Sequence, residues 1–214
     1  GIIKIGIPIG FQELLTQISF MCLVAFINRL GLEASSGYGV ANKIVAFVML
    51  VPSSLMQSMS SFVSQNVGAK NEKRATKSML TGMAIGAFIG IFVFTLIFFK
   101  GDFVSSVFTD NANVIRRSFE YLRGFAIEAV VTSVLFSFIG YFNGHGATML
   151  VMIQGLAQSF LVRLPMSYIM SVQPDASLAM IGLAAPTATV FGIALNLVFF
   201  IFYQKKLKIR GNEN

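Results

Sequence analysis

Six long runs of apolar residues, separated by short polar stretches, make up most of the chain. They cover residues 6–29, 36–66, 77–99, 117–142, 147–171 and 178–204. At 1.5 Å per residue, an α-helix of this length crosses roughly 30 Å of hydrocarbon. Backbone groups must be paired in lipid, and the strict alternation of a membrane β-barrel is absent. The pattern predicts an all-α polytopic membrane protein, with six transmembrane helices in one unit over residues 1–214.

The composition agrees with this pattern. The chain is 55% hydrophobic and 12% charged, with a mean hydropathy of +0.76, whereas soluble domains carry roughly 25% charged residues. Its net charge of +7 comes from basic residues at the ends of the apolar runs. Nucleic-acid binding needs a contiguous basic face, so the charge favours anionic lipid headgroups as partners and argues against DNA or RNA.

The positions of Lys and Arg predict the orientation in the membrane, because short basic loops stay in the cytoplasm. Basic residues mark the even-numbered boundaries and the start of the chain: Lys70, Lys73, Arg74 and Lys77 in the second loop, Lys205, Lys206, Lys208 and Arg210 after the sixth run, and Lys4 before the first. Three basic residues of the third loop oppose this trend, and two acidic residues in the same loop partly offset their positive charge. We therefore expect both chain ends in the cytoplasm of a bacterial-type inner membrane.

Two further features bear on packing. The sequence Asn143-Gly144-His145-Gly146 predicts a tight turn, which makes the fourth and fifth runs an antiparallel hairpin. Gly82, Gly86 and Gly90 recur every four residues, a spacing that lets another helix approach closely. Residues 101–116 are long enough for a short interfacial helix, although a plain connection fits equally well.

Signatures of enzyme chemistry are missing from the sequence. It has one histidine and one cysteine, and no HExxH, GxSxG, phosphate-binding loop or CxxC motif. His145 stands alone in its turn, where a solvated loop residue is the favoured interpretation, because a metal site needs several ligands. We predict no catalytic site, no bound metal and no cofactor.

An acidic residue within the first run is the leading candidate for function. Glu13 lies among apolar residues, and a charge there is costly and usually faces a cavity or pathway. Gln12 flanks it, and helical spacing places Gln17, Phe20, Val24 and Asn28 on its side of the helix. Pro8 removes a backbone hydrogen bond and predicts a hinge. The alternative is that Glu13 bonds a neighbouring helix.

The second run combines methionines and amides around a proline. Asn42, Met49, Met56 and Gln57 are candidate substrate-binding residues, because thioethers are flexible and polarisable and suit a promiscuous site. Pro52, among them, is a second hinge candidate. Ordinary helix packing is the alternative interpretation of these residues.

Two opposite charges lie in the predicted hairpin. Glu128 is in the fourth run and Arg163 in the fifth, so the two helices are neighbours. We predict a structural ion pair between them, since pairing offsets part of the cost of burying each charge. Pro165 follows Arg163 closely and is the third hinge candidate.

Several motifs resemble one family of membrane transporters. GIPIGFQELL opens the first run, VPSSLMQSMSSFVSQNVGA closes the second, and YFNGHG and VRLPMSY lie in the hairpin. These segments resemble the multidrug and toxic compound extrusion (MATE) family over essentially the whole chain. The match corresponds to the C-terminal six-helix lobe of a twelve-helix transporter. We therefore expect a piece of a longer protein whose N-terminal six-helix lobe is a partner outside this sequence.

The resemblance implies cation-coupled export. Protons or sodium ions would flow inward while small amphipathic, often cationic drugs leave through a cleft between the lobes, of which this chain supplies one wall. The family's acidic residue in the first helix of this lobe corresponds to Glu13, which would alternate between a protonated and an ionised state. The alternatives are a flippase for lipid-linked sugars from the same superfamily, and a non-transporting membrane scaffold subunit.

Overall fold

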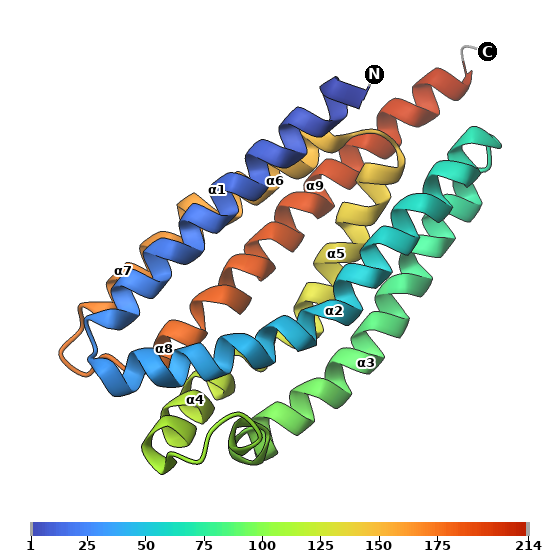
Figure 1. Cartoon of the computed structure of the whole chain (residues 1–214). Coiled ribbons are helices and arrows are strands. Elements are labelled where there is room, and N and C mark those ends of the chain that lie inside the picture. The colour runs from blue at the N-terminus through green and yellow to red at the C-terminus, as the bar shows by residue number, and fades with distance from the viewer. Residues whose placement is uncertain (1, 213–214) are drawn as a thin grey trace.

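The computed structural model describes the backbone of residues 2–212, and all side chains in that range except those of residues 2–6, 8, 9, 12, 13 and 206–212. Its elements are α1 (Ile2–Asn28), α2 (Leu32–Gly68), α3 (Glu72–Ser106), α4 (Ala112–Phe125), α5 (Glu128–Gly144), α6 (Thr148–Ala157), the π-helical segment η1 (Gln158–Arg163), α7 (Leu164–Ser171), α8 (Leu178–Gly182) and α9 (Ala184–Asn212) (Figure 1). The described backbone contains no strand, so the all-α prediction is confirmed.

The predicted spans correspond to helices of membrane-crossing length. Four helical stretches are long and apolar enough to cross a bilayer, and they cover Leu32–Gly68, Glu72–Ser106, Thr148–Ser171 and Leu178–Lys205. The pair α4 and α5 makes a fifth candidate, bent by 48° at its break. In α1, the described apolar part is the shorter stretch Leu14–Asn28.

The helices run up and down, so that alternate connections lie at the same end of the bundle. Both termini, the α2–α3 turn and the α5–α6 turn lie at one end, and the other connections lie at the opposite end (Figure 1). The predicted tight turn is present: the Gly146 N–H donates to the Asn143 carbonyl at 2.9 Å, and Gly146 has a φ of +71°. The fourth and fifth runs therefore form the expected hairpin.

His145 in this turn is not the solvated residue that the sequence favoured. Its side chain is 2% exposed, and Nε2 lies 2.9 Å from a carboxylate oxygen of Glu72 at the start of α3. Its Nδ1 lies 2.9 Å from the Tyr141 carbonyl oxygen. The prediction was wrong because Glu72 and the rings of Tyr141 and Tyr203 pack around the imidazole and exclude water from it.

The glycine row packs as predicted. Gly82, Gly86 and Gly90 are buried on α3. Gly86 and Gly90 lie against Ser133 and Ala129 of α5, whereas the nearest side chain to Gly82 is Met59 of α2. A Cβ at position 86 would lie 2.7 Å from the Cβ of Ser133, and one at position 90 would overlap the backbone of Ala129. The row therefore lets the α3 and α5 backbones come closer than larger side chains would permit.

Two helix breaks shape the end of the bundle opposite the termini. The fourth predicted run is bent at residues 126–127 between α4 and α5. Beside this break, α8 lies against α4 through two glycines: a Cβ on Gly124 would overlap the Ala179 carbonyl, and one on Gly182 would lie 2.6 Å from the Tyr121 carbonyl oxygen. In α3, Lys100 has non-helical angles at the predicted end of the third run, and residues 101–106 continue as helix beyond it.

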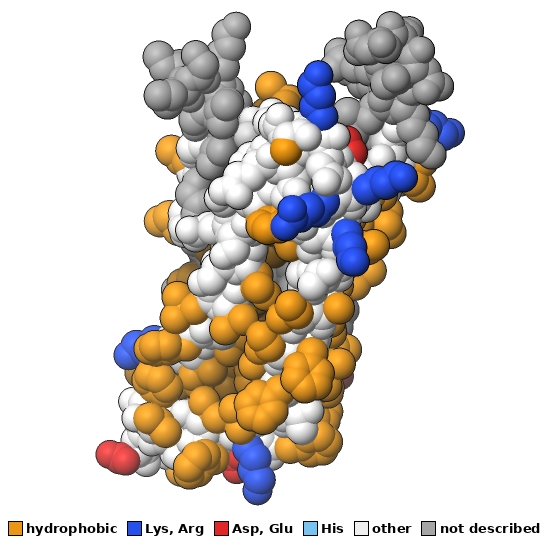
Figure 2. Space-filling view, turned by 90° about the vertical axis from the view of Figure 1, so that its right-hand side faces the viewer, with side chains coloured by type: hydrophobic (Ala, Val, Ile, Leu, Met, Phe, Trp, Pro, Cys, Tyr) orange, Lys and Arg blue, Asp and Glu red, His pale blue; other side chains and the backbone are white. Residues whose placement is uncertain are grey.

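The outer surface suits a lipid environment. Large apolar side chains point outward along the helices, among them Phe88 at 77% and Phe92 at 70% exposure on α3. Figure 2 shows hydrophobic side chains over much of one face, with Lys and Arg gathered towards the end that carries the termini. A soluble protein rarely exposes so large an apolar surface, and the chain is a multi-pass membrane protein.

Two apolar clusters fill the interior. One joins α1, α2, α4 and α8 and includes Ile27, Tyr38, Leu122 and Ile181. The other joins α2, α3, α5 and α6, with partly buried side chains from α9, and lies nearer the termini. Polar and aromatic side chains line a cavity that borders both clusters.

Candidate functional site

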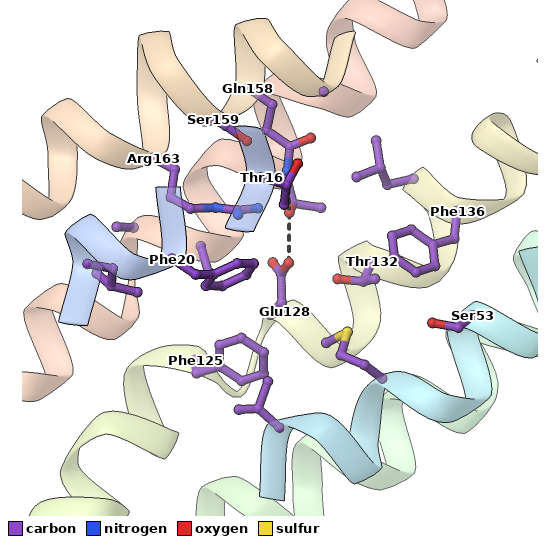
Figure 3. Close-up of a pocket in the computed structure, with 18 of the residues that line it drawn as sticks. Thr16, Phe20, Ser53, Phe125, Glu128, Thr132, Phe136, Gln158, Ser159 and Arg163 are labelled. Atoms are coloured by element: carbon purple, nitrogen blue, oxygen red, sulfur yellow. Dashed lines mark hydrogen bonds between the residues drawn. The ribbon is translucent and has the colours of Figure 1, made fainter. Parts of the chain in front are cut away.

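The cavity has a volume of about 530 Å³, within the range of small-molecule sites. Its walls come from α1, α2, the α4–α5 pair, the α6–η1 segment and the α8–α9 pair. Just over half of the lining residues are apolar or aromatic and the others are polar or charged, with Glu128, Thr132 and Arg163 among those labelled in Figure 3. This combination is typical of sites that bind amphipathic molecules.

The second helix contributes the residues that its sequence suggested. Asn42, Met49, Met56 and Gln57 all line the cavity, although they span four turns of α2. Pro52 is buried in the same stretch, where Figure 1 shows that α2 curves. The structure thus brings these four candidates to one cavity wall, and their role in binding stays a prediction.

Glu128 is the acidic group of the site. It is 6% exposed and begins α5 directly after the break from α4, so its carboxylate lies at a helix N-terminus, whose dipole favours negative charge. Thr189 donates to its Oε1 at 2.8 Å. Its Oε2 is buried with no hydrogen-bond partner among the described residues. One carboxylate oxygen therefore remains available to a bound cation or proton.

A chain of hydrogen bonds leads to this carboxylate from the fifth run. Gln154 donates to Gln158 at 2.5 Å, Gln158 donates to Thr189 at 3.2 Å, and Thr189 donates to Glu128. All four side chains are buried, and every donor points towards the carboxylate. A Cβ at Gly192 would lie 2.5 Å from the Gln158 amide oxygen, so a glycine there leaves room for the glutamines.

The π-helical segment explains how Arg163 reaches the cavity. Residues five apart lie about 140° apart around an α-helix, but a π-helix bonds residue i to residue i+5 and brings them to one side. Gln158 and Arg163, the two ends of η1, both line the cavity. Pro165 follows and lacks the N–H that would bond the Leu161 carbonyl in a regular helix.

Arg163 is held by an aromatic ring rather than by an acid. Its Cζ lies 4.9 Å from the ring centroid of Phe20 on α1, a distance at which the ring attracts the guanidinium. Its Nε and Nη1 are buried without a hydrogen-bond partner among the described residues. Two nitrogens of a buried guanidinium therefore have unused hydrogen-bonding capacity.

The predicted direct ion pair between Glu128 and Arg163 is absent from the structure. Among the described side chains Arg117 and Glu120 form an ion pair, and the His145 imidazole lies 2.9 Å from a carboxylate oxygen of Glu72. Both residues of the predicted pair line the same cavity and point into its centre (Figure 3). The hairpin places them on neighbouring helices as expected, but the carboxylate bonds Thr189 and the guanidinium packs on Phe20.

The first helix turns a different side to the cavity than its polar residues suggested. Thr16, Phe20 and Leu23 line the cavity, while Gln17 is exposed on the adjacent side. Asn28 lies outside the cavity, where its Oδ1 accepts a hydrogen bond from Ser35 at the α1–α2 turn. The side chains of Glu13, Gln12 and Pro8 lie outside the described residues.

Sequence reasoning overlooked several polar residues of the cavity and its surroundings. Gln154, Gln158 and Thr189 were not singled out, nor was Asn196, which is fully buried with both amide atoms unpaired among the described residues. A signal was available: Gln154 and Gln158 are four residues apart, and Thr189 and Asn196 seven apart, within otherwise apolar runs. Polar residues at helical spacing inside a span usually face a cavity or another helix.

The site offers charged and polar groups for ligand binding, and no metal centre is found among its described side chains. Among the described side chains, no three His, Cys, Asp or Glu residues are close enough together to hold a metal ion. What the cavity offers is one acid, one guanidinium, amides, hydroxyls and aromatic rings. These groups recognise organic molecules by shape and charge.

Comparison with known proteins places the chain in a family. A MatE family model matches residues 8–169. The probable multidrug resistance protein NorM of Bacillus cereus is 23% identical over 99% of this chain and 47% of its own length. The probable multidrug resistance protein YpnP of Bacillus subtilis is 23% identical over 79% of this chain and 38% of its own length.

Solved structures share the fold. The outward-facing conformation of a multidrug resistance MATE family transporter of the MOP superfamily matches with a TM-score of 0.86 at 14% identity, over 95% of this chain and 45% of that one. An inward-facing conformation matches with a TM-score of 0.76 at 15% identity, over 97% of this chain and 48% of that one. The chain spans about half the length of the proteins it resembles. Because the family model matches more than half of its residues, the chain belongs to the MatE family of transporters and is not an enzyme.

Proposed function

We propose that this chain is one half of a multidrug efflux transporter that exchanges amphipathic, often cationic drugs for protons or sodium ions. One observation carries the proposal: a buried carboxylate, Glu128, with a free oxygen in a largely apolar cavity of about 530 Å³. The apolar and aromatic wall suits the body of such a drug, and the acid suits its charge. The relatives named as multidrug resistance proteins support the same activity.

Competition for acidic groups couples the two fluxes in this proposal. Burial disfavours an ionised carboxylate without a partner, so Glu128 holds either a proton, a sodium ion or the cationic group of a drug. Each ligand shifts the balance between inward-open and outward-open states through its different affinity for the two. Glu13 remains part of the proposal: it lies three and seven residues before Thr16 and Phe20, the spacing of residues on one side of a helix.

A second six-helix lobe is the proposed partner. The family match covers about half of each relative, and such transporters rock two lobes around a central site. The cavity borders α1 and α2, whose outward sides carry exposed Phe11, Leu14, Phe47 and Leu50. In this proposal the second lobe covers part of that surface and completes the substrate pathway.

The charges at the two ends of the bundle support an orientation with both termini in the cytoplasm of a bacterial inner membrane. At the terminal end, one described residue is acidic, Glu72, and five are basic: Lys70, Lys73, Arg74, Lys77 and Lys205. Five basic and five acidic residues balance at the opposite end: Arg29, Lys100, Arg116, Arg117 and Arg123 against Glu33, Asp102, Asp110, Glu120 and Asp175. With Lys4, Lys206, Lys208 and Arg210, which the sequence places near the two chain ends, the terminal end has nine Lys and Arg residues against five at the opposite end. Such an excess of Lys and Arg predicts the cytoplasmic side.

Cysteine labelling in whole cells tests this orientation. In a protein whose Cys22 is replaced by serine, a cysteine introduced by Lys73→Cys is expected to resist a membrane-impermeant maleimide until the cells are opened. A cysteine introduced by Asp102→Cys, at the other end of α3, is expected to react in intact cells. The reverse pattern would show that the termini lie outside the cytoplasm.

Transport in vesicles tests the proposed activity. The complete transporter that contains this chain is reconstituted into liposomes and given a fluorescent organic cation, with an imposed proton or sodium gradient. We expect dye movement against the direction of the ion, driven by one of the two gradients and abolished when that gradient is collapsed. Dye movement at the same rate with and without each gradient would contradict coupled exchange. Lipid flipping without dye movement would favour the flippase alternative.

The same assay tests the acid of the first helix. Glu13→Gln is expected to abolish gradient-driven dye movement while the amount of folded protein stays unchanged, because an amide cannot exchange a proton. Glu33→Gln is the matched control, since Glu33 is an exposed residue at the α1–α2 turn that bonds Asn113. Normal transport by the Glu13 variant would remove this residue from the mechanism and leave Glu128 as the acid.

A further inference from the structure

A histidine lies enclosed where three helices meet, at the end of the bundle that carries the termini. His145 follows α5, and its side chain is 2% exposed. The ring centroid of Tyr141 lies 4.2 Å from that of the imidazole, and the ring centroid of Tyr203 on α9 lies 5.3 Å from it. Glu72, at the start of α3, completes the enclosure and has a side chain that is 38% exposed. These four residues lie outside the lining of the cavity and form a separate cluster.

Both ring nitrogens of His145 face groups that accept hydrogen bonds. Nδ1 lies 2.9 Å from the carbonyl oxygen of Tyr141, which has lone pairs only, so Nδ1 carries a hydrogen. Nε2 lies 2.9 Å from a carboxylate oxygen of Glu72, and an ionised carboxylate also only accepts. A neutral imidazole has one N–H and one acceptor nitrogen. To bond both partners, the pair must therefore hold one proton more than a neutral imidazole and a carboxylate.

The backbone favours the imidazole as the place of this extra proton. His145 caps the C-terminal end of α5, where the helix dipole favours a positive charge. Glu72 is the first residue of α3, directly after the N-cap residue Asn71, where the dipole favours a negative charge. Both helix ends therefore stabilise an imidazolium beside an ionised carboxylate. Charge-assisted hydrogen bonds of this kind are roughly twice as strong as neutral ones.

The other titratable groups around the ring leave this assignment unchanged. Tyr141 on α5 and Tyr203 on α9 are phenols, which are neutral throughout the pH range in which histidine changes charge. Lys73 and Arg74 follow Glu72 on α3, and both are exposed. Among the described contacts of the imidazole, Glu72 is thus the group whose charge balances the extra proton.

We propose that His145 and Glu72 form a proton-binding site outside the cavity, and that the bound proton fastens the start of α3 to the α5–α6 hairpin. When the proton leaves, one N–H faces two acceptors, so the contact between Nε2 and the carboxylate opens and Glu72 turns towards water. The folded protein holds a proton that the unfolded chain has released above about pH 7. The stabilisation is therefore present at low pH and is lost as the pH rises.

Nitrogen NMR of the imidazole tests where the protons lie. The complete transporter that contains this chain is labelled with isotopically enriched histidine, and the signals that disappear in His145→Gln are assigned to this residue. At about pH 7.5, where a solvated histidine is mostly neutral, we expect both nitrogens of His145 to show the chemical shift of a protonated nitrogen. An unprotonated Nε2 at this pH would overturn the inference.

Glu72→Gln separates a bound proton from a merely structural contact. The amide N–H of glutamine can donate to a neutral Nε2, so the hydrogen bond is kept without the extra proton. We expect this variant to show a protonated Nδ1 and an unprotonated Nε2 at the same pH. Glu33→Gln is the matched control, since Glu33 is exposed and bonds Asn113 at the opposite end of the bundle, and it is expected to keep both nitrogens protonated. Two protonated nitrogens in Glu72→Gln would show that this carboxylate does not hold the proton on the ring.

Hydrogen exchange tests whether the proton fastens the two connections. Backbone exchange in residues 71–76 and 143–148 is followed by mass spectrometry at about pH 6 and about pH 9, on the two sides of the ordinary titration of histidine, relative to unstructured peptides at the same pH. Since a hydrogen bond to a charged group is worth enough to change an opening equilibrium about tenfold, we expect protection in the wild-type protein to fall roughly tenfold at the higher pH. In Glu72→Gln it is expected to change less than about twofold, because that hydrogen bond needs no extra proton. Equal changes in the two proteins would contradict the role of the proton, and no step of these measurements involves transport.

Discussion

Glu128→Gln is expected to lower gradient-driven drug efflux about tenfold or more in the complete transporter. Removing one charge from a buried site that recognises an opposite charge typically costs 2–5 kcal/mol, and each 1.4 kcal/mol is a factor of ten. The amide oxygen can still accept the hydrogen bond from Thr189, so the local structure is retained. What is lost is the ability to exchange a proton, a sodium ion and a cationic drug at one position.

The measurement compares initial rates of dye efflux with the amount of folded protein, which is determined by size-exclusion chromatography of a fluorescent fusion. Folded protein is expected at the wild-type level, because neutralising a carboxylate with an unpaired buried oxygen removes a desolvation cost. Glu33→Gln is again the matched control at an exposed position. Efflux by Glu128→Gln at the wild-type rate would show that the cavity acid has no part in coupling.

The helices and their order follow from the sequence because lipid imposes strong rules. Backbone groups must be paired within each span, so long apolar runs are helices, and their ends appear where polar residues begin. The tight turn at residues 143–146 and close helix packing at the glycine row could also be predicted, because both depend on local residue types; which helices pack against the row could not. The backbone kink at Lys100 lies directly after the predicted end of the third run.

The cavity could be predicted only in part. The four candidates on α2 line it, because polar amides rarely face lipid and because Met49 and Met56 recur at seven-residue spacing from Asn42, on the same side of the helix. For α1, helical spacing from Glu13 suggested a face with Gln17, Phe20, Val24 and Asn28, but of these four only Phe20 lines the cavity, together with Thr16 and Leu23. The rotation of a helix depends on its neighbours, and one polar residue does not fix it.

Irregular backbone caused the other differences. Spacing rules assume a regular α-helix, so they do not place Gln158 and Arg163 together at the two ends of a π-helical segment. They also treat residues 117–142 as one straight span, whereas the break before Glu128 puts this acid at the start of α5. Pro165 was a visible signal for the first irregularity, but the second has no proline near it. The hinge roles of Pro8, Pro52 and Pro165 stay predictions.

Gly124→Ala is expected to destabilise the protein by about 3 kcal/mol, at the upper end of the range for overpacked positions. A Cβ at this position would overlap the backbone carbonyl of Ala179 on α8. Backbone atoms cannot turn aside as a flexible side chain can, so α8 must move away from α4. That movement also disturbs the start of α9, which carries Thr189, the hydrogen-bond donor to Glu128.

Thermal unfolding of the purified complete transporter, followed by loss of the monodisperse peak on size-exclusion chromatography, measures this effect as a lower apparent Tm. Gly39→Ala provides the control in α2, because a Cβ there has no neighbour within 4 Å. It is expected to leave the apparent Tm unchanged or to raise it slightly, since alanine stabilises a helix by roughly 0.5–1 kcal/mol relative to glycine. Equal Tm values for the two variants would show that α4 and α8 do not pack as closely as the structure places them, and would remove the physical basis for the position of Thr189 beside Glu128.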